Sequence, residues 1–528
     1  MPSGFLALLL HAHLPFVRHP EHEDFLEEDW LFEAIAETYI PLLQSFRRLR
    51  TEEVPFRLTM TMTPPLCAML RDPLLQDRAE RYLRRGATLA EEEIARTEDN
   101  PPVHELARFY FARFSEALRF YVEDLRRDVV SAFADLQRSG HIEIITCAAT
   151  HGFLPLMEQF PEALRAQVLI GRDYHRECFG VDPLGIWLPE CGYVAGIESA
   201  LLAANLRWFV IDAHGLMFAQ PRPRFAMFAP CYTPTGPAAF ARDRESSKQV
   251  WSAQEGYPGD PAYRDFYRDI GLELPEEALR GFLPEGPRRN SGIKYHRITG
   301  RGGSKELYVR GWAEAAADAH AKDFMEARVR QIEHLRSMMG IEPIVLSPFD
   351  AELFGHWWFE GPEFLDLFIR KACFDQKVFE FTTPTAYLAS HPVAQIVSPC
   401  ASSWGHKGYW EVWLDQSNSW IYPHLHAAAR RMTDLAKQYT RTTPTAFQDR
   451  MLRQIARELL LAQSSDWAFL MKTGTARPYA ERRTRDHLLR FNRLFDELSR
   501  GDTSSTILGP CEERDNLFPN LNWKHYAG

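Results

Sequence analysis

Short runs of apolar and β-branched residues recur along the chain, and polar side chains follow each run at once. Seven runs have this form, at residues 5–10, 56–62, 142–146, 185–188, 208–211, 344–347 and 378–382. Because helical stretches separate the runs, they predict strands of a parallel sheet. In a (β/α) barrel the loops after the strands converge on one face, so these polar residues are candidates for an active site. An open doubly wound sheet fits the same pattern, but no Gly-x-Gly-x-x-Gly motif follows a run, which weakens a dinucleotide-binding interpretation.

Three stretches depart from this alternation. Residues from about 70 to 135 are charged and have helical periodicity, and we interpret them as a helical insertion in the barrel. Residues from about 214 to 300 are rich in Gly and Pro, which predicts long loops near the active site. After residue 395 a Trp-rich segment precedes amphipathic stretches near 424–439, 445–463 and 477–499. We therefore expect a barrel over residues 1–395 and an all-helical domain over residues 396–528.

Composition narrows the possible partners. Of the 528 residues, 45% are hydrophobic and 25% are charged, as in folded globular proteins. The net charge of −10 has the wrong sign for binding a phosphate backbone. No apolar run near the start approaches the roughly 20 residues that a membrane span needs, and no basic residue precedes the first apolar run. The eight cysteines are scattered without a Cys-x-x-Cys pair. We expect a cytoplasmic monomer that binds neither nucleic acid nor membrane.

Two histidines stand at the end of the first predicted strand. His11 and His13 are two residues apart, so strand alternation places both on one face. They could be metal ligands together with His151, Asp212 or His214, as in deacetylases. They could equally be neutral groups that hydrogen-bond a polar substrate, or a structural pair. The residues alone leave these alternatives open.

Two carboxylates follow buried strands in aromatic surroundings. Glu190 ends the segment Gly185-Ile-Trp-Leu-Pro-Glu190, and Asp350 lies in Leu346-Ser-Pro-Phe-Asp350. A single carboxylate in such a place is more often a helix cap or an ion-pair partner. Two of them on one barrel face suit retaining glycoside chemistry, in which one is the nucleophile and the other protonates the leaving oxygen. Aromatic neighbours would raise the pKa of the acid so that it keeps its proton near neutrality.

Tryptophans near these carboxylates suggest a groove for sugars. A sugar presents C–H faces that stack on aromatic rings, while its hydroxyls bind polar groups. Aromatic clusters more often belong to the core, but here polar and glycine residues interleave with them. The tryptophans concerned are Trp251, Trp357, Trp358, Trp404, Trp410, Trp413 and Trp420.

The ordered motifs resemble those of glycoside hydrolase family 57, and most closely those of its 1,4-α-glucan branching enzymes. The motifs are His11-Ala-His-Leu-Pro15, Thr150-His-Gly152, Trp187-Leu-Pro-Glu190, Phe349-Asp-Ala-Glu-Leu-Phe-Gly-His-Trp-Trp358, Ser403-Trp-Gly405, Ser465-Asp-Trp467 and Arg514-Asp-Asn-Leu-Phe-Pro519. Each motif is weak, but their order and the long Asp350 motif are specific. Together they extend over nearly the whole chain.

This resemblance implies a (β/α)7 barrel with a helical insertion, a helical C-terminal domain, and a retaining mechanism without metal or other cofactor. It implies that Glu190 is the nucleophile and Asp350 the general acid/base, acting on an α-1,4-glucan such as amylose or a glycogen-like polymer. The substrate-binding positions that it implies are His11, His13, His151, Arg242, Trp251, Gly259, Trp404, Trp413, Asp466 and Thr475. Thr475 stands where some relatives have Gln, and Phe349 stands where many have Tyr before the acid.

The family resemblance leaves the outcome of the reaction open. A branching enzyme presents a glucose O6 to the intermediate, whereas a hydrolase admits water. The loop around Tyr232 is similar to a mobile loop of the family, and we expect Tyr232 to cover the intermediate and favour transfer. The alternatives are an α-amylase or 4-α-glucanotransferase with the same carboxylates, a metal-dependent deacetylase that uses His11 and His13, and a non-catalytic glycogen-binding protein.

Overall fold

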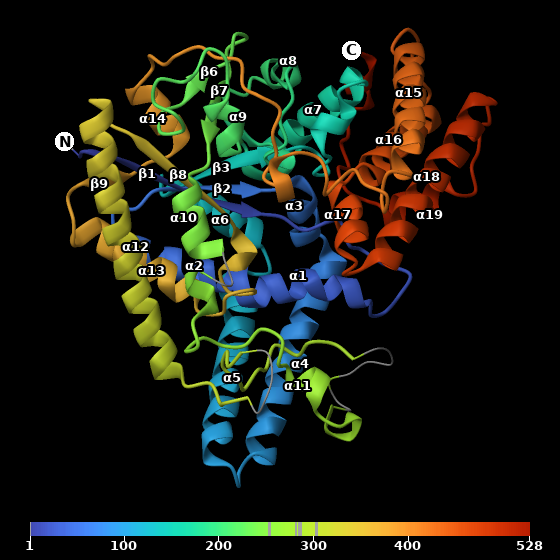
Figure 1. The fold of residues 1–528 in the computed structure, drawn as a ribbon. Coiled ribbons are helices and arrows are strands. Elements are labelled where there is room, and N and C mark those ends of the chain that lie inside the picture. Colours follow the sequence, from blue (N-terminus) through green and yellow to red (C-terminus); the bar gives the residue numbers. More distant parts are fainter. Residues whose placement is uncertain (1, 252–254, 280–281, 283–287, 301–304) are drawn as a thin grey trace.

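The computed structural model describes residues 2–251, 255–279, 282, 288–300 and 305–528. Its centre is a curled sheet with seven parallel strands in the order β7-β5-β4-β3-β2-β1-β8 (Figure 1). These strands are β1 (Gly4–Ala12), β2 (Leu58–Met62), β3 (Ile142–Cys147), β4 (Gly185–Trp187), β5 (Trp208–Ile211), β7 (Ala238–Ala241) and β8 (Ile344–Asp350). Two short strands are added to them: β6 (Cys231–Tyr232) lies antiparallel to β7, and β9 (Phe379–Phe381) lies beside the start of β1.

The predicted α/β barrel class is confirmed. All seven long strands are parallel, and the two end strands of the sheet approach each other where the backbone N–H of Asp243, just after β7, donates to Leu346 O of β8 at 2.7 Å. The structure corrects one part of the predicted strand set. The sequence pattern gave no strand between residues 211 and 344, yet β7 completes the barrel there. The strand was not predicted because its Ala-Ala-Phe-Ala segment is too short to stand out in a region rich in Gly and Pro.

Strand alternation explains why polar groups reach the barrel interior. Along β1, Leu6, Leu8 and Leu10 pack in the outer core beneath the helices, whereas Ala7 and Leu9 pack inside the barrel. His11 continues this inner series at the strand's C-terminal end. Parallel strands need apolar residues on both faces because helices cover the outside, and β1 is accordingly apolar until His11.

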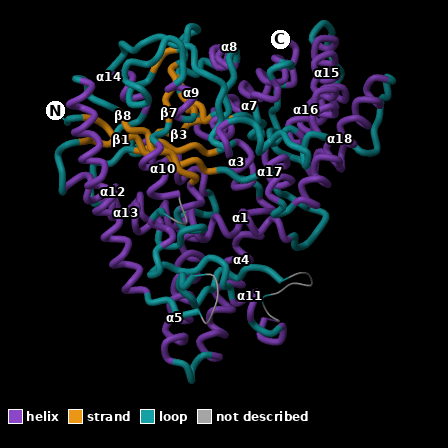
Figure 2. Tube along the Cα trace, viewed as in Figure 1, coloured by secondary structure: helices purple, strands orange, loops and turns teal. Residues whose placement is uncertain are grey.

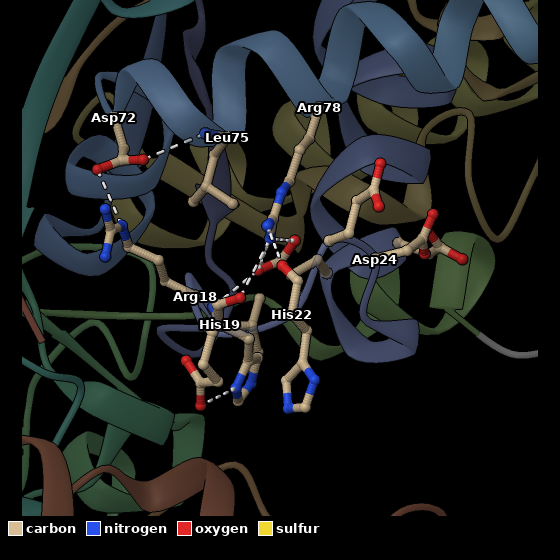
Figure 3. Close-up of polar contacts among 12 residues, drawn as sticks. Arg18, His19, His22, Asp24, Asp72, Leu75 and Arg78 are labelled. Atoms are coloured by element: carbon tan, nitrogen blue, oxygen red, sulfur yellow. Dashed lines mark hydrogen bonds and ion pairs between the residues drawn. The ribbon is translucent and has the colours of Figure 1, made fainter. Parts of the chain in front are cut away.

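A long helical hairpin occupies much of the predicted insertion. Helices α4 (Pro73–Arg96) and α5 (Pro101–Arg119) pack against each other and project from the sheet (Figure 1). Buried ion pairs attach the base of α4 to the loop after β1 (Figure 3). Arg78 lies 2.6 Å from Glu28, and Arg18 Nε lies 3.0 Å from Asp72. Because that loop begins at His13, these ion pairs help to fix the position of His13, a candidate site residue.

The C-terminal part of the chain is helical, as predicted (Figure 2). Three long helices fall close to the predicted ranges, and α16 begins with a capping box between Thr445 and Gln448. The helices are α15 (Ile421–Tyr439), α16 (Ala446–Ala462), α17 (Ser465–Thr473), α18 (Arg477–Ser499) and α19 (Leu508–Arg514). The N-terminus of α17 reaches the barrel, where the Ser465 N–H donates to His151 O at 3.1 Å.

The terminal Arg514–Pro519 motif joins this helical part to the barrel. Arg18 donates to the backbone carbonyl of Arg514 at 3.3 Å, and the Asn516 amide donates to Asp72 at 2.8 Å. The motif therefore meets the same residues that anchor α4.

The remaining helices cover the sheet and its edges. They are α1 (Asp29–Ala34), α2 (Ile40–Thr51), α3 (Pro64–Leu70), α6 (Val129–Arg138), α7 (Pro161–Phe179), α8 (Ile197–Ala203), α9 (Ala213–Met217), α10 (Arg244–Trp251), α11 (Ile270–Glu273), α12 (Arg310–Met339), α13 (Gly361–Phe374) and α14 (Pro384–Ser390). Of the loops predicted over 214–300, residues 252–254, 280–281 and 283–287 lie outside the described residues. None of the helices in the described residues is long and apolar enough to cross a membrane. The domain limits at 1–395 and 396–528 stay a prediction.

Candidate active site

Three histidines form the floor of the site at the C-terminal ends of β1 and β3. His11 is 2% exposed, and its ring stacks on Trp187 at 4.7 Å between centroids. Its Nε2 lies 3.2 Å from His151 Nε2. The His13 and His151 rings are nearly parallel at 3.8 Å. The structure therefore brings together all three histidines that the sequence selected.

His13 links the barrel to the C-terminal helices. Its Nε2 lies 3.1 Å from Asp466 on α17, and its Nδ1 lies 3.0 Å from the Thr63 hydroxyl after β2. Burial acts to lower the pKa of His13, but the Asp466 carboxylate outweighs it, and the net pKa is raised. Burial acts to raise the pKa of Asp466, yet His13 brings it down to about 2. The pair is therefore an imidazolium and a carboxylate over a wide pH range.

The other two histidines are neutral. Burial, followed by the charge of neighbouring histidines, holds the pKa of His11 and of His151 well below the usual value. A neutral imidazole has one donor and one acceptor nitrogen, so such a ring can bind a sugar hydroxyl in either sense. His151 Nδ1 lies 2.8 Å from the Ser465 hydroxyl, which leaves its tautomer dependent on that contact.

Glu190 is held in a left-handed backbone conformation. Its φ of 63° and ψ of 23° are uncommon for a residue other than glycine, and the next residue, Cys191, also has a positive φ of 51°. The backbone N–H of Trp404 donates to the backbone carbonyl of Glu190 at 3.0 Å and holds this turn in place. Such local strain is typical of residues that the fold positions for function.

Two side chains donate hydrogen bonds to the Glu190 carboxylate. Trp404 Nε1 donates to Oε2 at 2.7 Å, and the Ser465 hydroxyl donates to Oε1 at 3.2 Å. Burial raises the pKa of Glu190 to about 7, with the Trp404 donor acting against the rise. The carboxylate thus becomes an oriented anion near neutral pH, as a nucleophile requires.

Asp350 has a different environment. It ends β8 beside His11 in the strand register. Burial is the main reason that its pKa is raised well above the usual value, and the charges of Glu352 and Glu190 add to the rise. Among the described residues no side-chain hydrogen bond or ion pair reaches its carboxyl group. Asp350 therefore keeps a proton that it can donate.

The two carboxyl groups influence each other because they share one site. Glu190 is among the charges that raise the pKa of Asp350. The Trp404 and Ser465 donors favour the charged form of Glu190, whereas no side-chain donor reaches Asp350 among the described residues. A pair whose environments separate their pKa values in this way can act as nucleophile and acid on one bond.

A metal centre fits these residues poorly. His13, His151 and Asp466 each offer a ligand atom within 4.8 Å of one another. Metal binding needs in-plane nitrogen lone pairs that converge, but the His13 and His151 rings are stacked within 14° of parallel. Asp466 and Ser465 also already contact the His13 Nε2 and His151 Nδ1 atoms.

A second polar group lies where β5 and β7 end. Arg242 Nε donates to Asp212 at 2.6 Å, and Asp212 also contacts His214 Nδ1 at 2.8 Å. The Arg242 guanidinium lies 5.8 Å from the centroid of the Trp404 ring. The Trp404 and Trp251 rings meet edge to face with their centroids 6.2 Å apart. Arg242, Trp251 and Trp404 thus gather beside Glu190.

Other residues chosen from the sequence lie elsewhere. Trp413 is 1% exposed and stacks on Phe153 at 4.4 Å, so its faces are covered. Thr475 is exposed after α17 and bonds Thr473, while Gly259 ends a short turn at Tyr257–Gly259. The structure does not bring these three into the histidine and carboxylate cluster.

Tyr232 also lies apart from the carboxylates. It pairs with Ala238, the first residue of β7, whereas Arg242 marks the opposite, active-site end of that strand. Its hydroxyl donates to Pro392 O at 3.1 Å. This placement lends no support to the expectation that Tyr232 covers the intermediate, because the whole edge strand would have to move.

The sequence pattern missed several contacts. Ser465, Thr63 and Glu352 all touch groups of the site, and Glu352 accepts the His13 N–H at 3.2 Å. Burial raises the pKa of Glu352 to about 7. Its place two residues after Asp350 was the available signal for Glu352. Ser465 begins the Ser465-Asp-Trp467 motif, which was its available signal, whereas nothing local marks Thr63.

Comparisons with known proteins identify the family of the chain. Residues 7–399 match the model of glycosyl hydrolase family 57, and residues 424–526 match the model of the 1,4-alpha-glucan branching enzyme C-terminal region. The chain is 33% identical to the 1,4-alpha-glucan branching enzyme TK1436 of Thermococcus kodakarensis, over 98% of this chain and 77% of that protein.

Two solved structures are similar over almost their whole length. The α-amylase AmyC of Thermotoga maritima is 43% identical, with 100% of this chain and 99% of that chain covered and a TM-score of 0.93. The family 57 branching enzyme of Pyrococcus horikoshii is 34% identical, with 100% and 97% covered and a TM-score of 0.89. The chain belongs to glycosyl hydrolase family 57.

Proposed function

We propose that the protein is a 1,4-α-glucan branching enzyme, a hexosyltransferase that acts on an amylose-like or glycogen-like polymer. The observation that carries this proposal is the pair of buried carboxyl groups with different environments. Glu190 accepts two hydrogen bonds, whereas Asp350 is raised in pKa by burial and by neighbouring carboxylates. The match of residues 424–526 to the C-terminal region of branching enzymes supports transfer over hydrolysis.

The chemistry proceeds in two displacements. Glu190 attacks the anomeric carbon of an α-1,4-linked glucose, and its carboxylate electrons form the new C–O bond. The old glycosidic bond breaks toward O4, which takes the proton from Asp350. In the second step the acceptor's O6 attacks that carbon, loses its proton to Asp350 and releases Glu190. Two inversions retain the α configuration.

We assign the remaining site residues as substrate contacts. The neutral His11 and His151 form the floor on which the sugar lies, with their facing nitrogens in contact with each other and His151 Nδ1 in contact with Ser465, and the His13–Asp466 pair fixes the ring orientations. Trp404 serves as both a donor to Glu190 and an aromatic wall, with Arg242 and Trp251 beside it. Gly259, Thr475 and Trp413 stay candidates on the family pattern alone, and we place no chemistry on them.

Hydrolysis is the second candidate, favoured by the 43% identity to an α-amylase. Both outcomes use the same first displacement and differ only in whether water or O6 attacks the intermediate. A 4-α-glucanotransferase would differ in the hydroxyl used. Tyr232 lies too near the far end of β7 to decide among them in this conformation.

The deciding experiment is incubation with amylose, with Glu190→Gln as control. We expect α-1,6 linkages, detected by proton NMR and isoamylase digestion, with few new reducing ends. Abundant reducing ends without α-1,6 signal would establish a hydrolase instead, and transfer without α-1,6 signal a 4-α-glucanotransferase. Loss of this activity on treatment with a chelator would contradict the mechanism without metal.

We also propose that domains 1–395 and 396–528, whose limits follow from the sequence pattern, work within a cytoplasmic monomer. Light scattering would then give a mass near 61.0 kDa. Twice that mass would contradict the monomer.

A further inference from the structure

A second group of aromatic rings lies at the surface and has no part in the mechanism above. Trp357, in the loop after β8, is 54% exposed, and Tyr267 is 79% exposed. Between them Phe266 stacks on Trp357 with ring centroids 4.6 Å apart and planes 26° apart. The Phe266 and Tyr267 rings meet edge to face at 5.2 Å. Exposed groups of large aromatic side chains on a soluble protein mark binding surfaces.

This group, here called the aromatic platform, is separate from the tryptophans around Glu190. Trp404 contacts Trp251, Trp187 and His11. Within the described part of the chain, no ring contact joins those side chains to the aromatic platform. Each catalytic carboxylate therefore has an aromatic surface of its own: Trp404 touches Glu190, and Trp357 follows Asp350 in the same loop.

One buried carboxylate ties the two halves of the aromatic platform together. Glu37, in the helical turn Ile35–Tyr39, lies 2.8 Å from His356 Nδ1, next to Trp357. It also accepts from Arg264 at 3.2 Å, two residues before Phe266. Burial acts to raise the pKa of Glu37, but Arg264 and His356 bring it down to about 2, so the Glu37 carboxylate is charged.

Further contacts make the Phe266 loop rigid. Buried Lys294 donates to Phe266 O at 2.7 Å, and its ammonium lies 4.3 Å from the Phe266 ring. The fully buried Asp269 accepts backbone N–H groups of Gly271 and Ser291, each at 2.8 Å. Rings held in this way lose little entropy when a ligand stacks on them.

The aromatic platform connects directly to the loop that carries the acid. The Trp357 N–H donates to Glu352 O at 3.2 Å, and the Glu352 carboxylate accepts the His13 N–H. Asp350, Glu352 and Trp357 thus belong to one tightly folded loop. A chain lying on the aromatic platform approaches the site from the side of the acid.

We propose that Trp357, Phe266 and Tyr267 form a subsite for the acceptor α-glucan chain. The ligand class follows from chemistry, because glucose rings present C–H faces that stack on aromatic rings. The charge of Arg268, next to Tyr267 in the sequence, is paired with Glu273. The acceptor is the occupant because its O6 must give a proton to Asp350 after the leaving chain, whose O4 took that proton, has departed and while the donor's glycosyl part is bonded to Glu190 beside Trp404. The inference rests on the proposed transfer function and adds where its second substrate binds.

Two measurements test the subsite. In the first, wild type, Trp357→Ala and Trp357→Phe act on amylose, and α-1,6 linkages are counted against new reducing ends. We expect Trp357→Ala to lower that ratio about fivefold, since losing one aromatic stacking surface costs roughly 1 kcal/mol, and Trp357→Phe to retain most of it. Phe374→Ala is the matched control, because Phe374 is 63% exposed at the far end of α13.

In the second, maltoheptaose is titrated into the inactive Glu190→Gln variant with and without Trp357→Ala. We expect affinity to fall about fivefold, and to stay unchanged with Phe374→Ala. An unchanged ratio together with unchanged affinity overturns the subsite, and a lower affinity with an unchanged ratio overturns its assignment to the acceptor. If wild type forms no α-1,6 linkages while affinity still depends on Trp357, the transfer function fails and the glucan-binding surface stands.

Discussion

Glu190 and Asp350, the two proposed catalytic carboxylates, occupy opposite kinds of environment, although they lie close enough for Glu190 to raise the pKa of Asp350. Glu190 sits on a strained turn and accepts hydrogen bonds from Trp404 and Ser465. Asp350 ends a regular strand, and its charged form is opposed by burial and by the nearby Glu352 and Glu190. The contrast shows that role is set by surroundings, because the two groups have the same chemistry in water.

A further contrast is where the supporting groups come from. Both donors to Glu190 come from the C-terminal third of the chain, while Glu352 belongs to the same loop as Asp350. The nucleophile therefore depends on how the helical part meets the barrel. The acid depends mainly on its own loop.

Exchanging each carboxylate for its amide should have the largest effect on activity and should show most clearly whether the two groups have different roles. Asp350→Asn and Glu190→Gln should each lower activity on amylose by about 10²-fold or more. A maltosyl donor whose leaving group needs no proton should restore the first displacement in Asp350→Asn but not in Glu190→Gln. Equal rescue of both variants would show that the two roles are not distinct. Burst kinetics of leaving-group release provide the measurement.

Removing a donor from the nucleophile should have an intermediate effect. In Trp404→Phe the indole N–H is lost, so the pKa of Glu190 rises further above its present value of about 7. The acid limb of the pH profile of kcat/KM should move to higher pH, and the rate at pH 7 should fall about tenfold. Ser465→Ala is the matched removal of the second donor and should act in the same direction more weakly. An unmoved acid limb in both variants would contradict the assignment.

The smallest expected effect is on the free energy of unfolding, through the ion pair between His13 and Asp466. The depressed pKa of Asp466 stabilises the fold above its ordinary value of 3.8, and this is lost as pH falls toward 2. The pKa of His13 is raised in the folded state, so its contribution to stability is fully present below the ordinary value of 6.5. This contribution is lost as the pH rises through the raised pKa of the folded state.

Between pH 3.8 and 6.5 both terms are present. Asp466→Asn should therefore lower the free energy of unfolding by about 1 kcal/mol at pH 5.5, and by less at pH 9. Urea denaturation at the two pH values checks this. A loss that is larger at pH 9 would reverse the sign that the pair requires.

Much of the fold was readable from local patterns. Seven apolar runs became β1, β2, β3, β4, β5, β8 and β9, and the long C-terminal helices fell within a few residues of their predicted ranges. These elements are strongly periodic or strongly apolar, so the chain itself specifies them. The strand β7 was missed because a segment of four residues, Ala-Ala-Phe-Ala, carries little signal.

The site was readable only where its residues follow strands. His11 and Asp350 face each other in the register of β1 and β8, and Glu190 follows the end of β4 in the turn Pro189–Cys191. Ser465 reaches Glu190 across several hundred residues of sequence, and the core position of Trp413 against Phe153 is equally a matter of packing. Tyr232 shows the same limit, because its register with Ala238 decides which end of the barrel it faces.

The measurement that tests the account most directly is peptide mass spectrometry of Asp350→Asn after reaction with a maltosyl donor that needs no acid. Without Asp350 to assist the second displacement, the glycosyl-enzyme should accumulate, with its added mass on the peptide that contains Glu190. The Glu190→Gln/Asp350→Asn double variant should carry no adduct. An adduct on another residue, or an unmodified Glu190 peptide while donor is consumed, would contradict the roles assigned to the two carboxylates.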